Sequence, residues 1–376
     1  MKLATRTLTL VGIGLLTAGY VGVMQGCSSS SNTSTSGPSV GGPPARPDAP
    51  KTTSTAEHNF AVDALFLGDT DRQNNPSSSA WKKFGYNIDG KVTTKDSADV
   101  CTPVAGGSKE VDGDNGIDNA FGSRIIPLLQ TFQHDISKAL TEGLHKSSFT
   151  IMLDTVGLTD DAKQTNTGLT AQLFAGGDFA DPTFTTKDDW PVRPEGLKDP
   201  SNLKSGSKVA FSDAFIVAGT WVNGEGGEIA LSVQVSGQTL TLTIHRATVT
   251  FDHAGASAKN GTIAGVIDTE EFLTGLKGIA GQVSEGLCSG SAFESIAQQI
   301  RGMSDILKDG TNRAGVKCDG ISIGIGFTAQ EILPPSKLAA PSTPRPDKCS
   351  ADGGTQDSGT DSGSGTDSGG TDAGAG

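Results

Sequence analysis

The segment Gly320-Ile321-Ser322-Ile323-Gly324 matches the G-x-S-x-G pattern in which serine hydrolases present their nucleophile. That chemistry needs the serine on a sharp turn between a strand and a helix, with a histidine later in the chain. Here isoleucines alternate with Ser and Gly as far as Phe327, which indicates a continuous strand, and no histidine follows Ser322. We therefore predict that Ser322 is not a nucleophile.

The overlapping segment from Gly324 to Ala329 superficially matches a dinucleotide-binding fingerprint. The fingerprint requires a helix directly after it, whereas Pro334 and Pro335 leave room for one turn. We therefore expect no nicotinamide cofactor at this segment.

Asp112-Gly113-Asp114-Asn115-Gly116-Ile117-Asp118-Asn119 gathers the oxygen ligands that calcium prefers. Counted from Asp112, the acids Asp114 and Asp118 occupy the third and seventh places of an EF-hand loop. The sixth place is Ile117 instead of Gly and the twelfth is Ser123 instead of Glu. Asp and Asn also form turns and cap helices. The sequence therefore leaves two readings, a turn or a calcium site of Asp112, Asp114 and Asp118, and calcium is the one cofactor it suggests.

His245 and His253, with Asp252 beside them, are the strongest histidine candidates for metal or acid–base chemistry. They share one face of an extended strand by parity but lie about 26 Å apart along it, too far for one site. His58, His134 and His145 are scattered, and we expect surface or capping roles for them. Adjacent acids stand in loops or at a helix start, where no cleft brings them face to face: Asp160-Asp161, Asp188-Asp189 and Glu270-Glu271. No catalytic set can be assigned from the sequence.

The first residues have the pattern of a signal peptide. Lys2 and Arg6 precede an apolar run from Leu8 to Met24, which is shorter than the roughly 20 residues that a spanning helix needs. The run ends at the small Gly26, directly before Cys27. We therefore predict cleavage over retention as a membrane helix.

Val23-Met24-Gln25-Gly26-Cys27 resembles the lipobox of bacterial lipoproteins. Gly26 and Cys27 fit that family, whereas Met24 and Gln25 replace the preferred Leu and small residue, which keeps ordinary signal cleavage as an alternative. The resemblance implies a lipid on Cys27, and Ser28 is compatible with outer-membrane sorting. It predicts an exported chain, anchored to the outer membrane and facing the periplasm or the cell surface.

Composition divides the chain into four parts. We expect a signal peptide at 1–26, a disordered Ser/Thr/Pro tether at 27–56, a folded domain at 57–348 that could divide near 200, and a disordered Gly/Asp/Ser/Thr tail at 349–376. This layout resembles lipoproteins of myxobacteria, and the resemblance implies a location but no activity.

The net charge of −13, with no run of Lys or Arg, argues against a nucleic-acid partner. The partners we expect are the membrane, through the lipid, and a neutral or cationic small molecule, polysaccharide or protein.

Four cysteines remain once Cys27 is assigned to lipid, and an even number in an exported chain suggests two disulfides. We predict Cys288–Cys318, because the two flank one expected helix, and Cys101–Cys349 by remainder. No two cysteines have the close spacing of a zinc site.

Residue alternation predicts strands at 60–67, 149–156 and, as a meander, across 208–268, with a hairpin turn at Ser236-Gly237. Apolar periodicity predicts amphipathic helices from about 123 to 144, from a capping box at 268–271 onward, and from 293 to 307. The expected fold is α+β, an antiparallel sheet with three helices packed on one face, or alternatively a β-sandwich with helical insertions.

The function that these observations favour is non-enzymatic binding of a ligand or partner in the cell envelope. The alternative is a hydrolase of envelope polysaccharide or lipid, whose catalytic groups only the fold brings together.

Overall fold

The computed structural model describes residues 40–341 except 105, 132–133, 147–148, 236–237, 284 and 289. Nine strands follow one another along this part of the chain, and every pairing between them is antiparallel. They are β1 (Glu57–Phe66), β2 (Thr150–Val156), β3 (Asn166–Gly176), β4 (Val209–Val217), β5 (Thr220–Val222), β6 (Gly227–Val235), β7 (Gln238–His253), β8 (Ser257–Asp268) and β9 (Gly320–Ile332).

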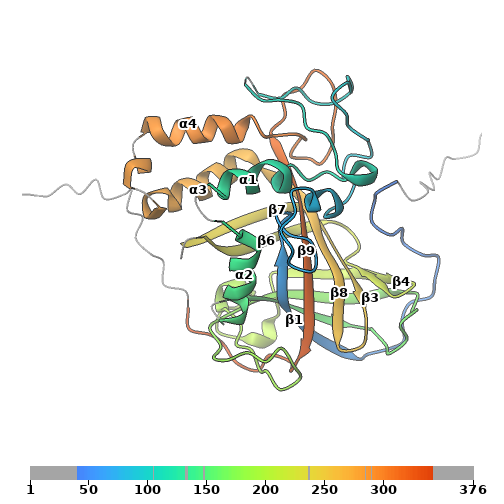
Figure 1. The fold of residues 1–376 in the computed structure, drawn as a ribbon. Helices are drawn as coiled ribbons and strands as arrows, with labels where there is room; N and C mark the ends of the chain where they lie inside the picture. Colours follow the sequence, from blue (N-terminus) through green and yellow to red (C-terminus); the bar gives the residue numbers. More distant parts are fainter. Residues whose placement is uncertain are drawn as a thin grey trace, which may run out of the picture. The chain divides into compact units, whose positions relative to one another are not determined.

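The sheet closes on itself (Figure 1). Its strand order is β5-β4-β3-β2-β1-β9-β8-β7-β6, and β5 also pairs with β7, so eight strands form a closed antiparallel barrel. The ninth, β6, continues past the barrel as a hairpin with β7. The first and last strands, β1 and β9, are neighbours in the wall. Strands on both sides of residue 200 therefore build one barrel.

Aromatic side chains fill the inside of the barrel. Phe60 of β1 and Phe251 of β7 have ring centroids 5.7 Å apart although their strands are not neighbours, so both rings point inward. Trp221 of β5 stacks on Phe251 at 5.1 Å and is fully buried. Gly261 leaves space for the ring of Phe327, because a Cβ there would lie 2.5 Å from three ring atoms. This packing makes the interior a hydrophobic core.

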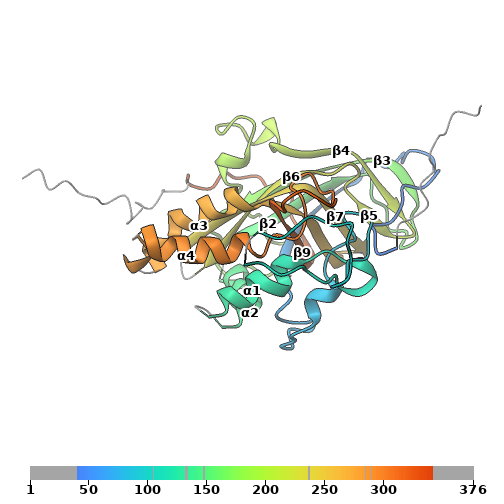
Figure 2. The same cartoon turned by 90° about the horizontal axis from the view of Figure 1, so that it is seen from above.

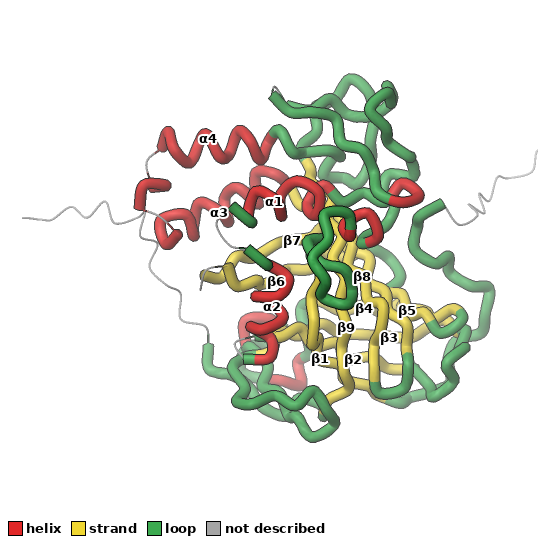
Figure 3. Tube along the Cα trace, viewed as in Figure 1, coloured by secondary structure: helices red, strands yellow, loops and turns green. Residues whose placement is uncertain are grey.

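Four α-helices lie outside the barrel, as Figure 3 shows in red: α1 (Ile126–Leu129), α2 (Ile136–His145), α3 (Thr269–Val283) and α4 (Gly290–Arg301). Helix α2 buries Leu140 and Leu144 against β1. Helix α3 follows β8 directly, packs on β7, and runs beside α4 (Figure 2). Phe272 of α3 meets the ring of Phe121 at 6.2 Å. In the described part of the chain, no helix has the length and apolarity needed to span a bilayer.

The predicted α+β sheet with helices on one face is wrong, and so is the sandwich alternative. The strands at 57–66, 150–156 and 209–268 form as expected, but β3 was not predicted, and the sheet closes where an open one was expected. Side-chain alternation marks the two faces of a strand equally in an open sheet, a sandwich and a barrel. Closure depends on the β1–β9 and β5–β7 pairings, which local patterns do not encode.

One of the three predicted helices has the expected extent. Helix α3 starts after Asp268, whose carboxylate accepts hydrogen bonds from the backbone N–H groups of Glu270 (2.9 Å) and Glu271 (3.2 Å). The expected helix at 123–144 is instead a π-helical turn at Phe121–Ile125, then α1, then α2, with Asp135 in the left-handed conformation before α2. The third helix, α4, ends at Arg301 and not near Leu307, because Ile306 pairs with Gly320.

A disulfide joins Cys101 to Cys318 and is fully buried beside Leu307. The expected pairings Cys288–Cys318 and Cys101–Cys349 are therefore wrong. The chain around Cys101 lies beside the approach to β9, where Thr102 N–H donates to Val316 O and Cys318 N–H donates to Thr102 O. The spacing of the cysteines along the sequence does not indicate which distant segments come into contact, so this pairing could not be predicted from it. Cys27 and Cys349 lie outside the described residues.

Residues 40–56, assigned to the tether from composition, pack against the barrel. Thr52 N–H donates to Thr167 O of β3, and Arg46 forms an ion pair of 2.6 Å with Asp213 of β4. The folded part of the chain thus begins earlier than the composition indicates.

Candidate functional site

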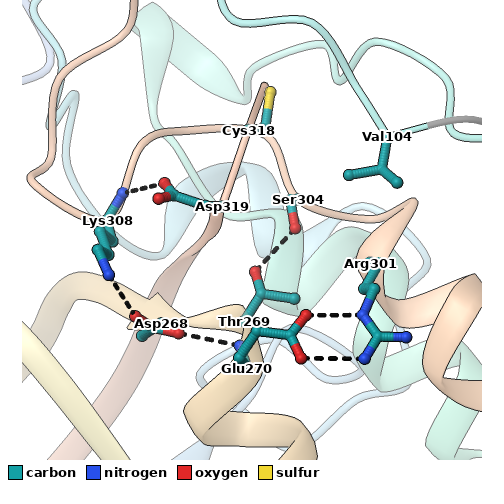
Figure 4. Close-up of a pocket in the computed structure, with 9 residues that line it drawn as sticks. All are labelled: Val104, Asp268, Thr269, Glu270, Arg301, Ser304, Lys308, Cys318 and Asp319. Atoms are coloured by element: carbon teal, nitrogen blue, oxygen red, sulfur yellow. Dashed lines mark hydrogen bonds and ion pairs between the residues drawn. The ribbon is translucent and has the colours of Figure 1, made fainter. Parts of the chain in front are cut away.

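A polar hollow of about 210 Å³ lies where α3 begins, α4 ends and the chain turns into β9 (Figure 4). Side chains from all three regions converge on it, and Cys318 places the disulfide in its wall. The lining residues are Val104, Asp268, Thr269, Glu270, Arg301, Ser304, Lys308, Cys318 and Asp319.

Two ion pairs organise the hollow. Arg301 binds Glu270 through two parallel contacts, Nε to Oε1 at 2.6 Å and Nη2 to Oε2 at 2.9 Å, and its Nη1 also binds Glu294 at 2.8 Å. Lys308 Nζ donates to Asp268 Oδ2 at 3.2 Å. Thr269 and Ser304 share a buried hydroxyl hydrogen bond of 2.8 Å beneath them. These contacts tie the first turn of α3 to the last turn of α4.

Three ionisable groups of the hollow, Asp268, Glu270 and Lys308, are held in their charged forms. The hydrogen bond from Arg301 lowers the pKa of Glu270. Burial raises the pKa of Asp268, but hydrogen bonds from Glu271 N–H and Lys308 outweigh burial and lower the pKa of Asp268 below its ordinary value. Asp268 in turn raises the pKa of Lys308. A general acid or base works best with a pKa near the working pH, so these shifts disfavour proton transfer and suit fixed, charged recognition groups.

A second hollow of about 400 Å³ adjoins the first and lies between α3 and α4. It shares Glu270 and Arg301 with the polar hollow, and Leu273, Leu287 and Phe293 supply apolar lining. We call the two hollows together the α3–α4 groove. Both hollows combine charged side chains with apolar surface, which is the composition of many ligand sites. The remaining residues around the second hollow are Thr274, Lys277, Gly290 and Glu294.

Sequence reasoning found one edge of this groove. The capping box at 268–271 predicts the start of α3, but the sequence assigns no partner to the adjacent acids Glu270-Glu271 at that helix start. Glu270 meets Arg301 across 31 residues and Asp268 meets Lys308 across 40, and no local pattern signals either pair.

Ser322 lies on β9 and is fully buried. Its Oγ donates to Asp305 Oδ2 at 2.6 Å and accepts from Ala120 N–H at 2.8 Å. The predicted continuous strand is confirmed for both glycine motifs, since β9 runs from Gly320 to Ile332 without a turn or a following helix. Ser322 fixes the strand to its neighbours.

Two acids of the expected calcium loop, Asp112 and Asp118, lie in one acidic neighbourhood, where Asp89 acts on both, but each accepts a hydrogen bond from a different backbone N–H. Asp112 accepts from Thr93 N–H at 2.5 Å, Asp118 accepts from Ile88 N–H at 2.6 Å, and Asp114 is exposed at the start of a 3₁₀ turn, Asp114–Gly116. The turn is therefore present. No group of three or more His, Cys, Asp or Glu able to hold a metal is found among the described residues. Calcium binding by Asp112, Asp114 and Asp118 stays a prediction.

His245 and His253 do not share a face, contrary to the parity argument. The register of β7 shifts between His245 and Thr248, and Arg246 has a φ of 52°, so the strand carries a bulge there. His245 turns to α3 and binds Glu271 at 2.8 Å and Glu228 at 3.2 Å. His253 turns into the barrel, where its ring lies 6.1 Å from that of Phe60.

The end of the barrel around His253 contains a second polar cluster that the sequence did not reveal. His58 of β1, expected at the surface, binds Glu331 of β9 through Nδ1 at 2.9 Å and meets the ring of His253 at 5.5 Å. His58 and Glu331 are 273 residues apart in the sequence. His145 Nε2 donates to Asp63 O at 2.9 Å, and His134 is exposed.

Comparison of this chain with protein-family models, with curated proteins and with solved structures finds no match.

Proposed function

We propose that this chain is an envelope protein that binds a ligand or partner in the α3–α4 groove without transforming it. The observation that supports this is the state of the groove's charges: five ionisable side chains line the polar hollow, but Glu270 with Arg301 and Asp268 with Lys308 form ion pairs. Fixed pairs recognise polar groups through hydrogen bonds, and they are poor proton donors and acceptors.

The barrel gives rigidity to this site and takes no evident ligand itself. Its interior is occupied by Phe60, Phe251 and Trp221, whose rings contact one another. Helix α3 continues directly from β8 and packs on β7, so the groove stands on the barrel wall. A binding site on rigid elements keeps its geometry without the ligand.

For the location, we propose export and attachment to the outer membrane through lipid on Cys27. The lipobox resemblance supports the attachment, and the buried Cys101–Cys318 disulfide supports an oxidising compartment outside the cytoplasm. Mass spectrometry of the native protein tests this: a diacylated or triacylated Cys27 as the first residue is expected, and an unacylated N-terminus before Cys27 would contradict it.

The binding proposal is tested with a photo-reactive amino acid in the full chain, produced in its native host. Placed at Thr274, which is exposed and lines the groove, it should give a specific cross-linked product. The matched control is Thr186, an exposed residue in the loop between β3 and β4. The Arg301→Gln change should weaken the Thr274 product and leave the background at Thr186 as it was.

Equal cross-linking at Thr274 and Thr186 would contradict a site in the groove. Release of soluble fragments from purified envelope polysaccharide or lipid, abolished by Glu270→Gln, would establish the hydrolase alternative instead.

A further inference from the structure

The pairing that closes the barrel, β5 with β7, is short. It joins three register pairs, Thr220 with Asp252, Trp221 with Phe251 and Val222 with Thr250, whereas β8 pairs with β9 from Ser257 to Asp268. We call this pairing the β5–β7 seam. Few hydrogen bonds hold it, and regions with few backbone bonds open at the lowest free energy.

The seam is continued at one end by a single hydrogen bond, from His253 N–H to Gly219 O at 2.9 Å. At the other end, Asn223 N–H donates to Val249 O at 3.1 Å, and the side chain of Asn223 donates to Ala247 O and accepts from Val249 N–H. On the outer face, Thr220 donates to Asp252 at 2.7 Å. The position of His253 is therefore next to the last register pair of the seam.

Each strand of the seam carries a buried polar side chain without a hydrogen-bond partner. Trp221 on β5 is 0% exposed and its Nε1 has none, and His253 on β7 is 4% exposed and neither ring nitrogen has one. An unpaired buried donor or acceptor is costly. Both side chains point into the barrel, Trp221 against Phe251 and His253 against Phe60, so both unpaired groups lie on the inner face of the seam.

The charged and titratable groups that face His253 come from three elements. His58 of β1 lies against its ring, Glu331 of β9 is bound to His58, and Asp160 lies in the loop between β2 and β3. Burial and the neighbouring His58 lower the pKa of His253, while the Gly255 backbone, Glu331 and Asp160 act in the opposite direction. Asp252, on the outer face, is bound to Thr220 and Asn260.

We propose that the β5–β7 seam is an acid-opened gate of the barrel, with the His253 imidazole as its trigger. A proton on the buried ring creates a charge that forms no ion pair within the described residues, because Glu331, one of the carboxylates that face the ring, is bound to His58. Water can solvate that charge when the seam separates. Acidification therefore shifts the population toward an open seam, since the open form binds the proton more tightly.

Trp221 reports on the gate because it is buried on the seam itself. In the full chain carrying Trp81→Phe and Trp190→Phe, acrylamide quenching of Trp221 fluorescence is measured at pH 7.5 and pH 5.0. We expect the quenching constant to rise roughly threefold or more at pH 5.0, as expected for a linked open form. Far-ultraviolet circular dichroism should stay the same, which separates gate opening from unfolding.

The variants His253→Gln and His253→Phe remove the proton site, so quenching should lose its pH dependence in both. The matched control is His245→Gln, which removes another histidine of β7 that binds Glu228 and Glu271 outside the barrel and should keep the acid response. Hydrogen–deuterium exchange on the wild-type chain checks the result without substitutions: after correction for intrinsic rates, residues 219–223 should lose protection at pH 5.0 relative to 150–156.

The proposal would be overturned if quenching of Trp221 and exchange at residues 219–223 were the same at pH 7.5 and pH 5.0 in chains that retain His253. An acid response that persists in both His253 variants would overturn it as well, because another group would then be the trigger.

Discussion

At the scale of single residues, Arg72 is the side chain that fastens the loop after β1 to the barrel wall. Its Nη1 donates to Gly261 O at 2.9 Å, its Nη2 donates to Thr262 Oγ1 at 3.2 Å, and its guanidinium lies 4.9 Å from the ring centroid of Phe84. We predict that Arg72→Leu lowers the free energy of unfolding by about 2–3 kcal/mol, because buried polar partners lose a charged donor.

Urea unfolding measures this loss of stability, and two further variants serve as comparisons. Arg72→Lys keeps the charge but not the fork of donors, so it should lie between Arg72→Leu and the wild type. Arg313→Leu removes an exposed arginine whose contact is a 3.7 Å ion pair with Asp309, and it should change stability by less than about 0.5 kcal/mol. An Arg72→Leu protein as stable as the wild type would show that the loop is held elsewhere.

At the scale of elements, the sequence predicts what periodicity and caps encode. The alternation in β6 and β7 and the cap at Asp268 are local, and the strands and α3 form as expected. Helix α4 ends early because Ile306 pairs with Gly320, a tertiary contact that overrides the apolar periodicity through Leu307. The same reason explains the groove: α3 was predictable, but its partners Arg301 and Lys308 are brought to it by the fold.

In the loop segment 86–118, Asp112 forms no ion pair within the described residues, unlike Asp99 and Glu110, and this gives the stability of the segment a pH dependence. Burial raises the pKa of Asp112 to about 7, with Asp89 and Glu110 adding to the effect. The folded chain thus binds this proton more tightly than the unfolded chain, so the contribution to stability is complete below the ordinary pKa of 3.8 and is lost as the pH rises toward 7. We predict that Asp112→Asn stabilises the protein at pH 8 by about 2 kcal/mol, a value discounted for partial exposure.

The difference between Asp112→Asn and the wild type should disappear near pH 4, which urea unfolding at a series of pH values will show. The matched control is Asp114→Asn, on the exposed residue two positions along, which should follow the wild type throughout. Repeating the series with calcium and with a chelator tests the calcium prediction, since a bound ion would make the Asp112→Asn protein the less stable one. A constant difference at every pH would contradict the titration of Asp112.

At the scale of the whole molecule, the fold depends on contacts between distant parts of the sequence. The barrel is closed by β1 with β9, His58 meets Glu331 across 273 residues, and the cysteines of the disulfide are 217 apart. Sequence patterns within a window of 20 residues carry no information on such partners. For that reason most strands and the helix α3 could be predicted from the sequence, whereas β3, the closure of the barrel, the groove and the disulfide pairing could not.

Loss of the Cys101–Cys318 disulfide should destabilise the whole fold. The disulfide closes a loop that contains β2 to β8, and in the chain-entropy model such a long loop contributes about 5 kcal/mol by restricting the unfolded chain. We predict that Cys101→Ser with Cys318→Ser lowers the free energy of unfolding by several kcal/mol. Cys288→Ser should change the free energy of unfolding by less than about 1 kcal/mol. If Cys288 were instead paired with Cys318, Cys288→Ser would remove a disulfide and lower the free energy of unfolding by several kcal/mol. Cys318 also lines the polar hollow, so the double variant should weaken cross-linking from Thr274 at temperatures where the protein remains folded. Full cross-linking from Thr274 in the folded double variant would show that the disulfide stabilises the chain but has no role in the groove.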